Sequence, residues 1–286
     1  MATKTFFHCN QEIIEWCWAS DHELMHNPYW ASCYLIDGLL IDSGAPGGVK
    51  EFRDFIDSLD RKIGACILTH SHEDHAGGAH MLNSEFGIPI FASKKAIPLL
   101  KSGYTYPEYR QIAWGEDGVL PVEVELIPNL ISSMSGKYTF HVLPIPGHAP
   151  DQIAPIEKQQ EWAFTSDGIQ VKYKRLFGSS SAIPEDISLI YQSIQDICRF
   201  TEKMSNLKIF LPGGKVFGRD LIDQKLEEIW NLRLEVYRYV DQDFSIDEIV
   251  VKIFGEEDLF ASLTNGKLSK KNLIESLIEW VKNSKN

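Results

Sequence analysis

Long apolar runs are absent from these 286 residues, and that absence narrows the class of protein. No stretch approaches the roughly 20 consecutive apolar residues that a membrane-spanning helix needs. The first residues, Met1-Ala2-Thr3-Lys4, lead into aromatic and polar residues without the apolar segment of a secretion signal. We find neither internal repeats nor low-complexity segments. The sequence therefore predicts a protein that is neither exported nor inserted in a membrane.

Cysteine is scarce, and no pair has the two-residue gap of a zinc knuckle or a redox motif. The five cysteines are odd in number and widely spaced: Cys9, Cys17, Cys33, Cys66 and Cys198. A disulfide framework is therefore not expected, and a reduced, cytoplasmic location is predicted.

Positive charge is also in short supply. The chain has 28 Lys and Arg against 40 Asp and Glu, a net charge of −12. Such a surface repels phosphate backbones, which argues against nucleic acid or an anionic membrane as partner. What the chain does have is 44% apolar and 11% aromatic residues, enough for a packed core and against disorder.

Apolar periodicity predicts a mixed α/β fold. Residues 34–42 (YLIDGLLID) predict a hairpin that turns at Asp37-Gly38, residues 49–59 a helix, and residues 62–69 a short buried strand. Strand, helix, strand is the α/β pattern. Further strands are expected at 88–92, 122–127, 138–143, 162–165 and 207–211, with a loop rich in Tyr, Pro and Gly before residue 122.

Helical spacing dominates later in the chain, at residues 184–204, 221–241, 246–254 and 270–281. No Pro-, Gly- or Ser-rich linker precedes the last three helices. We therefore expect an α/β domain over residues 1–217 and a small helical subdomain over residues 218–286.

The string Thr69-His-Ser-His-Glu-Asp-His75 follows the predicted buried strand. Three imidazoles and two carboxylates so close together do not serve packing, because each buried polar group would need its own partner. Alternation along an extended segment points His70 and His72 to the same side, toward one metal ion. Asp74 and His75 follow at the turn into a helix expected near Ala76. The string therefore predicts a metal site.

This string has the H-x-H-x-D-H pattern of the metallo-β-lactamase superfamily, and the resemblance extends over about residues 30–217. Three other motifs resemble the family's in the same order: Asp42 in Ile-Asp-Ser-Gly, His148 in Pro-Gly-His, and Asp167 in Phe-Thr-Ser-Asp. The resemblance implies a four-layer αβ/βα sandwich with a metal site at one edge, where strand ends converge. The C-terminal helices resemble the small helical extension of some members.

The resemblance also implies roles for these residues. The first metal ion would be bound by His70, His72 and His148, the second by Asp74 and His75, with Asp167 bridging the two. Asp42 would orient ligands, and Asp74 would be the general base that accepts a proton from the attacking water. Zinc is the expected metal, as one or two ions, with manganese or iron as alternatives.

The family's fifth motif is where this sequence departs from the pattern. The family usually has Pro-Gly-His-Gly after the last strand, whereas here Leu211-Pro-Gly-Gly-Lys215 places Gly214 where the last histidine belongs. No histidine follows His148, so the second ion would keep three ligands. His22 or His26 is an alternative source of the missing ligand, whereas His8 is expected to be solvated.

A few cations in this acidic chain are candidates for binding substrate. Lys172 and Lys174 follow Asp167 closely, and Lys215 follows Gly214. Loops at these positions border the cleft in the family, so the cations would receive an anionic substrate; a solvated, charged edge is the alternative.

The resemblance implies a metal-dependent hydrolase that acts on an ester-like bond, a thioester or lactone, of a small molecule, as glyoxalase-II-like enzymes do. A persulfide-dioxygenase-like enzyme is an alternative, with one iron bound by His70, His148 and Asp167. A nuclease of the same fold, or a degenerate metal-binding protein without activity, are further alternatives. Metal identity separates the first two readings.

Overall fold

The computed structural model describes residues 1–22 and 28–283. The chain falls into two compact units, each made of several stretches of sequence. The first comprises Met1–Pro144, Asp151–Ser166 and Leu207–Phe217, and the second Ile145–Pro150, Asp167–Asn206 and Gly218–Asn286. The second unit thus joins the C-terminal helices to the segments that carry His148 and Asp167, while a domain boundary at residue 217 stays a prediction.

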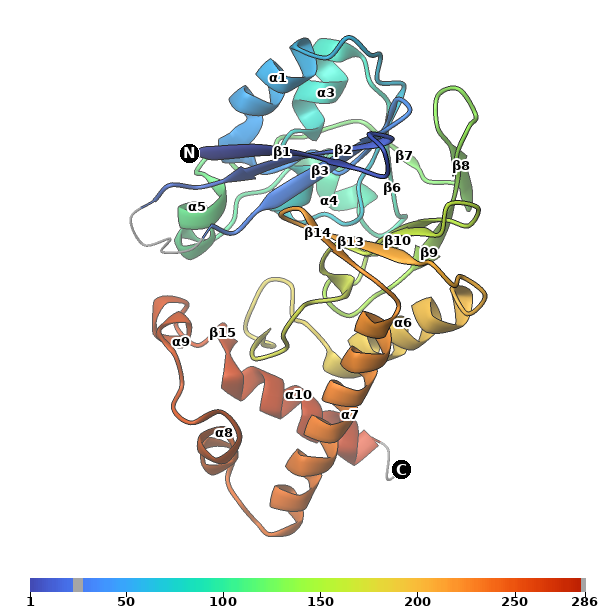
Figure 1. Ribbon diagram of the computed structural model, residues 1–286. Coiled ribbons are helices and arrows are strands. Elements are labelled where there is room, and N and C mark those ends of the chain that lie inside the picture. The colour runs from blue at the N-terminus through green and yellow to red at the C-terminus, as the bar shows by residue number, and fades with distance from the viewer. Residues whose placement is uncertain (23–27, 284–286) are drawn as a thin grey trace. The chain divides into compact units, whose positions relative to one another are not determined.

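Two β-sheets form the frame of the first unit (Figure 1). One sheet has seven strands in chain order: β1 Ala2–His8, β2 Ile13–Ala19, β3 Ala31–Ile36, β4 Leu39–Ile41, β5 Ala65–Ile67, β6 Ile90–Ala92 and β7 Val124–Leu126. Strands β1 to β4 pair antiparallel, and β4 to β7 pair parallel. The other sheet has the order β14 Lys215–Phe217, β13 Lys208–Leu211, β11 Trp162–Phe164, β10 Ile153–Glu157, β9 Thr139–Pro144 and β8 Leu130–Ser132.

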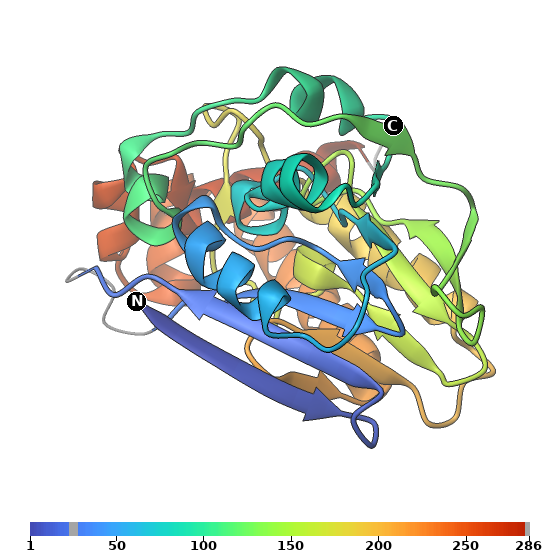
Figure 2. The ribbon, with the colours of Figure 1, turned by 90° about the horizontal axis from the view of Figure 1, so that it is seen from above.

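Side-chain alternation in the central strands divides the core into two layers. Ile41 and Ile67 pack toward the second sheet, where they share a cluster with Phe164. Their neighbours Leu40 and Cys66 point the other way, into a cluster that includes side chains from α1 (Val49–Asp57) and α3 (Ala79–Phe86). Figures 1 and 2 show these two helices on one face of the seven-stranded sheet. Because both faces of β4 and β5 are covered, these strands read as continuous apolar runs.

The predicted hairpin is confirmed, since Asp37 and Gly38 both take the positive φ, 44° and 75°, that a tight two-residue turn requires. The loop expected before residue 122 is wrong in part, because it contains a helix, α5 (Glu108–Trp114). The prediction also missed the β1–β2 hairpin and β10. The remaining helical turns of this unit are η1 Pro46–Gly48, α2 Glu73–Ala76 and α4 Ile97–Ser102.

The second unit is mainly helical, as predicted for its C-terminal part. Its helices are α6 Ile187–Phe200, α7 Asp220–Asp241, α8 Ile246–Phe254, α9 Leu259–Leu263 and α10 Lys270–Asn283, with a short pair of strands, β12 Leu176–Phe177 and β15 Leu268–Ser269. Rings of Tyr191, Trp230 and Trp280 from α6, α7 and α10 lie 5.1–6.3 Å apart and join these helices. A further helical turn, η2, covers Ser166–Gly168. Among the described residues, no helix has both the length and the apolar character needed to cross a bilayer.

Candidate metal centre

Asp42 and the histidine loop, which comprises residues 69–75, belong to the first unit. They lie at the carboxyl ends of two neighbouring parallel strands. Asp42 comes directly after β4, and Thr69 and His70 follow β5 by two and three residues. The Asp42 amide donates to the Ile67 carbonyl over 2.7 Å, which extends the pairing to the end of the sheet. Because parallel strands end on the same edge, the two motifs are brought together by the topology.

Asp42 is a buried carboxylate whose hydrogen bonds orient a histidine. Its Oδ1 accepts the Thr69 amide at 2.7 Å, and its Oδ2 accepts the Thr69 hydroxyl at 2.9 Å. The same Oδ2 lies 2.8 Å from Nδ1 of His75. A histidine that uses Nδ1–H toward a carboxylate presents Nε2 as the ligand atom. The contact with His75 that the predicted role of Asp42 requires is present, while the role itself stays a prediction.

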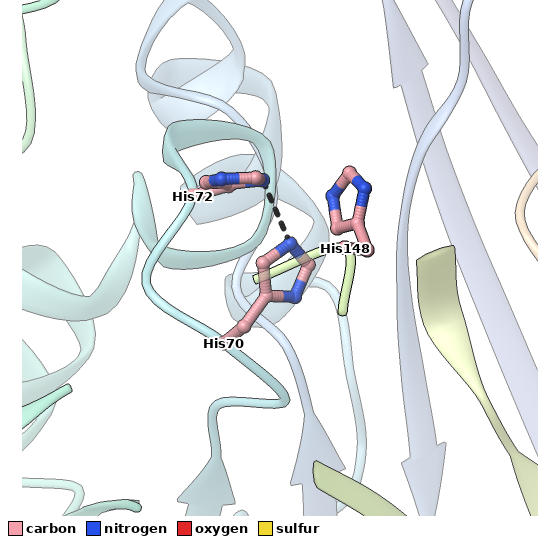
Figure 3. Close-up of side chains that lie close together, drawn as sticks. All are labelled: His70, His72 and His148. Atoms are coloured by element: carbon pink, nitrogen blue, oxygen red, sulfur yellow. Dashed lines mark hydrogen bonds between the residues drawn. The ribbon is translucent and has the colours of Figure 1, made fainter. Parts of the chain in front are cut away.

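His70 and His72 point to the same side, as the alternation predicts. Nε2 of His70 lies 3.0 Å from Nδ1 of His72 (Figure 3), and both side chains are buried. Tetrahedral zinc with bonds of about 2.0–2.1 Å holds neighbouring nitrogens roughly 3.3 Å apart. The pair of ring nitrogens is thus already close to the spacing that one ion requires.

The backbone of this loop is held from two sides. The Ser71 amide donates to Oδ2 of Asp151 at 2.8 Å, and the Ser71 carbonyl accepts the hydroxyl of Tyr104. The Thr69 carbonyl accepts the amide of Ile153 at 2.8 Å, from the first residue of β10. These bonds fix the loop before any ligand arrives, so the histidines are pre-organised.

Asp74 is buried, with 8% of its surface exposed, yet its carboxylate is incompletely paired. Oδ2 lies 3.3 Å from Nε2 of His75. Oδ1 accepts no hydrogen bond from the described residues, and Nη2 of Arg110 stands 3.9 Å away. Its neighbour Glu73, also buried, accepts a hydrogen bond from Nε of Arg110. A buried carboxylate oxygen without a donor is costly unless a cation binds it.

The second unit carries its own histidine and carboxylates. Nδ1 of His148 lies 2.6 Å from Oε1 of Glu185, whose Oε2 accepts the Phe177 amide at 2.7 Å. Nε2 of His148 is 3.4 Å from Oδ2 of Asp167. Gly147 lets the backbone before His148 pass close to α6, because a Cβ at this position would lie 2.4 Å from the Ile190 amide nitrogen. Glu185 thus orients His148, a role that no sequence motif predicted.

Five described side chains offer ligand atoms for a metal ion: His70, His72 and His75 in the first unit, and His148 and Asp167 in the second. Imidazole nitrogens and carboxylate oxygens are the donors that zinc, manganese and iron accept. The four histidines are buried and Asp167 is half-buried, so the residues present fit a transition-metal ion.

Residues 211–215, the loop that stands where the family has its fifth motif, are held by a buried carboxylate. Glu15 accepts the amides of Gly213 and Gly214 at 3.0 and 2.9 Å. Gly214 has φ +78°, and a Cβ there would lie 2.7 Å from the ring of Phe6. His8 is wrongly expected to be solvated: its Nε2 lies 2.8 Å from Glu15.

The candidate cations and the alternative histidine ligand lie on the surface. Lys172, Lys174 and Lys215 are exposed, the first two in the second unit and the last at the start of β14. Of the alternative histidines, His22 is an exposed residue of the first unit, and His26 lies outside the described residues.

Residues 28–192 of this chain match the protein family described as "Metallo-beta-lactamase superfamily". A hydroxyacylglutathione hydrolase of Haemophilus influenzae is 32% identical over 141 residues, 48% of this chain and 65% of the relative. A probable metallo-hydrolase of Bacillus subtilis is 29% identical over 123 residues, 42% of this chain and 53% of the relative. The matched regions thus span about half to two thirds of these relatives.

Solved structures show the same fold. A metallo-beta-lactamase from Pontibacter korlensis has a TM-score of 0.62 at 16% identity, covering 80% of this chain and all of that one. The predicted mixed α/β fold of the metallo-β-lactamase type, with helices at the C-terminus, is confirmed. Because the family match covers more than half of the chain and agrees with the fold, this protein belongs to the metallo-β-lactamase superfamily.

Proposed function

We propose that this protein is a metal-dependent hydrolase that cleaves an ester-like bond, a thioester or a lactone, in a small anionic molecule. The observation that carries the proposal is the buried Asp74 Oδ1, which has no hydrogen-bond donor among the described residues and stands beside the imidazole of His75. Family membership and the hydrolase names of two relatives support the same reaction class.

The ligand assignment follows the motifs. We assign His70, His72 and His148 to one ion, Asp74 and His75 to a second, and Asp167 to both. Zinc is the metal we expect, because nitrogen donors from three histidines suit it. The hydrogen bonds that Asp42 accepts from His75 and that Glu185 accepts from His148 support the assignment, since each pair leaves Nε2 of the imidazole as the ligand atom.

The reaction needs a nucleophile, a base and a polarised carbonyl. Bound zinc lowers the pKa of coordinated water and polarises a carbonyl oxygen. Asp74 is the residue we assign as general base, because its buried carboxylate has a second oxygen, Oδ2, that could accept a proton while Oδ1 binds the ion. The bonds that Ser71 makes to Asp151 and Tyr104 hold the histidine loop in place during turnover.

The substrate class draws on the relatives and on surface charge. The name of the Haemophilus relative specifies a hydroxyacylglutathione, which is an anionic thioester. Lys172, Lys174 and Lys215 are exposed cations that we assign to binding such an anion. We place the catalytic domain at residues 1–217, the helical subdomain at 218–286, and the protein in the cytoplasm.

Metal analysis together with hydrolysis assays tests this proposal. Purified protein is expected to contain one or two zinc ions per chain by plasma mass spectrometry, and to hydrolyse thioesters or lactones. His70→Ala and His148→Ala should each lose metal and activity together. His80→Ala, at a histidine of α3 that bonds the Pro121 carbonyl, is the matched control and should keep both.

Two outcomes would contradict the proposal. Full hydrolysis by His70→Ala or His148→Ala would remove the metal from the mechanism. About one iron per chain, with sulfur oxygenation in place of hydrolysis, would favour the persulfide-dioxygenase-like alternative.

A further inference from the structure

A closed segment, Tyr104 to Val119, folds against the histidine loop within the first unit. Its ends pair with each other, each amide donating to the other's carbonyl at 2.9 Å. Inside it, the Tyr106 hydroxyl donates to the Gly115 carbonyl at 2.7 Å. Gly115 packs so closely on η1 that a Cβ there would lie 2.6 Å from the Cα of Gly47. The segment is therefore an anchored part of the unit, and α5 lies within it.

Two side chains of this segment reach the residues around the histidines. The Tyr104 hydroxyl donates to the Ser71 carbonyl, and Nε of Arg110 donates to Oε1 of Glu73. The Glu73 and Arg110 side chains keep only 3% and 16% of their surface exposed. Buried ions of this kind require a partner, because an uncompensated charge in the interior is strongly destabilising.

The same guanidinium stands beside a second carboxylate. Glu73 and Asp74 are adjacent in sequence, and Nη2 of Arg110 lies 3.9 Å from Oδ1 of Asp74, beyond hydrogen-bonding distance. A guanidinium has five N–H donors and binds carboxylates strongly. Two neighbouring carboxylates therefore compete for one cation, and in this structure Glu73 receives the hydrogen bond while Asp74 Oδ1 does not.

We propose that Glu73 is a positioning residue that keeps the Arg110 guanidinium out of hydrogen-bonding distance of Asp74 and so keeps Asp74 Oδ1 available for a metal ion. This inference rests on the proposed function, in which Asp74 binds the second ion. Without the charge of Glu73, the guanidinium would turn to Asp74 and compete with the ion for the same oxygen. Arg110 in turn balances the buried charge of Glu73, so the two residues act as a pair.

Stepwise metal titration of the metal-free protein tests the inference, with cobalt(II) or zinc as the probe and calorimetry as the readout. Glu73→Gln is expected to weaken the second ion about 10- to 100-fold, the range typical for residues that support a metal ligand. The first ion should keep its affinity within about threefold. Glu73→Asp, which keeps the charge, should recover part of the loss.

The double variant Glu73→Gln/Arg110→Met decides between competition and general damage. It removes the competing guanidinium together with its partner, so it should restore the second ion's affinity to near that of the unaltered protein. It also leaves neither Glu73 nor Arg110 as an unpaired buried charge, and therefore stays informative if the single variant does not fold. Glu85→Gln is the matched control: Glu85 pairs with Arg53 on the surface of the same unit, and both affinities should stay unchanged.

Three results would overturn the inference. They are an unchanged second ion in Glu73→Gln, a double variant as weak as the single one, and an unaltered protein that binds one ion only. Failure of the proposed function looks different, because hydrolysis would then be missing or independent of His70 and His148. A hydrolase that loses nothing in Glu73→Gln refutes only the role of Glu73.

Discussion

Replacing Glu15 by glutamine tests how the loop of the departing fifth motif is held. Glu15 is fully buried, and its Oε1 accepts the Ser32 hydroxyl at 2.8 Å and the amides of Gly213 and Gly214 at 3.0 and 2.9 Å. Oε2 lies 2.8 Å from Nε2 of His8. Burial alone would raise the pKa of Glu15, but these hydrogen bonds outweigh burial and hold the pKa below its ordinary value of 4.5.

The cost of Glu15→Gln is worked from the three bonds that Oε1 accepts from Ser32, Gly213 and Gly214, each of which loses its charge. A hydrogen bond to a charged group contributes about 1.5–3 kcal/mol and a neutral one about 0.5–1.5 kcal/mol, so each bond loses roughly 1 kcal/mol. The glutamine carbonyl can take the place of Oε1 and keep the three short bonds in neutral form. We therefore expect the free energy of unfolding to fall by about 3 kcal/mol, measured by urea denaturation with tryptophan fluorescence near pH 7.

Low pH should reduce the difference in the free energy of unfolding between the unaltered protein and Glu15→Gln. Because the folded pKa of Glu15 is lowered, its charge stabilises the fold fully above the ordinary value of 4.5, and this contribution is lost as the pH falls through the folded pKa. The gap between the two proteins is therefore expected to narrow below about pH 4.5.

The control is Glu12→Gln, which changes a carboxylate close to Glu15 in the sequence. The Glu12 side chain keeps 41% of its surface exposed and pairs with Lys137 and the Tyr138 hydroxyl, so Glu12→Gln should cost less than Glu15→Gln. Equal, small losses in the two variants would refute the reasoning, because they would mean that the buried carboxylate contributes no more than a surface ion pair.

Three further outcomes are expected. Gly214→His should neither add a metal ion by plasma mass spectrometry nor keep full stability in urea, because φ is +78° and the Cβ would meet the Phe6 ring; a gain of one ion per chain would contradict this. Asp42→Asn should weaken the second ion about 10- to 100-fold by calorimetry, because His75 loses its charged acceptor, and an unchanged affinity would count against the assignment. Removal of metal by a chelator should lower the midpoint of urea unfolding and abolish hydrolysis, and re-addition of zinc should restore both; activity that survives chelation would contradict a metal mechanism.

Local sequence patterns were enough to predict the frame of the site. The alternation that pairs His70 with His72, and the Asp37-Gly38 turn that places β4, depend on neighbours in sequence. Strand ends were also predictable, because apolar runs stop where the polar motifs begin. The helix over residues 49–57 and the last helices matched their predicted positions closely, because apolar residues three or four apart mark a helix locally in the sequence.

Long-range pairs were beyond such reasoning. Glu185 lies 37 residues from His148, and Arg110 lies 37 residues from Glu73. Neither spacing is a motif, and a single acidic residue in an acidic chain carries no signal of its partner. Arg110 was hidden further because its helix falls in a stretch that Tyr, Pro and Gly made look like a loop. Only the folded chain shows which carboxylate meets which cation.

Hydrogen-bond satisfaction separates the four buried carboxylates around the histidine loop into two kinds. Asp42 bonds Thr69 and His75, Glu73 accepts Arg110, and Asp151 accepts the Ser71 amide. Asp74 differs, since its Oδ1 receives no hydrogen bond from the described residues although the residue is also buried.

A buried carboxylate oxygen without a hydrogen-bond donor would be selected against on stability alone, because desolvation costs several kcal/mol. The same fold places hydrogen-bond donors beside the three other carboxylates, so it could also have placed one beside Oδ1 of Asp74. The unpaired oxygen therefore supports the proposed cation at Asp74, and the imidazole of His75, 3.3 Å from the other oxygen, is a donor of the kind that transition-metal ions accept.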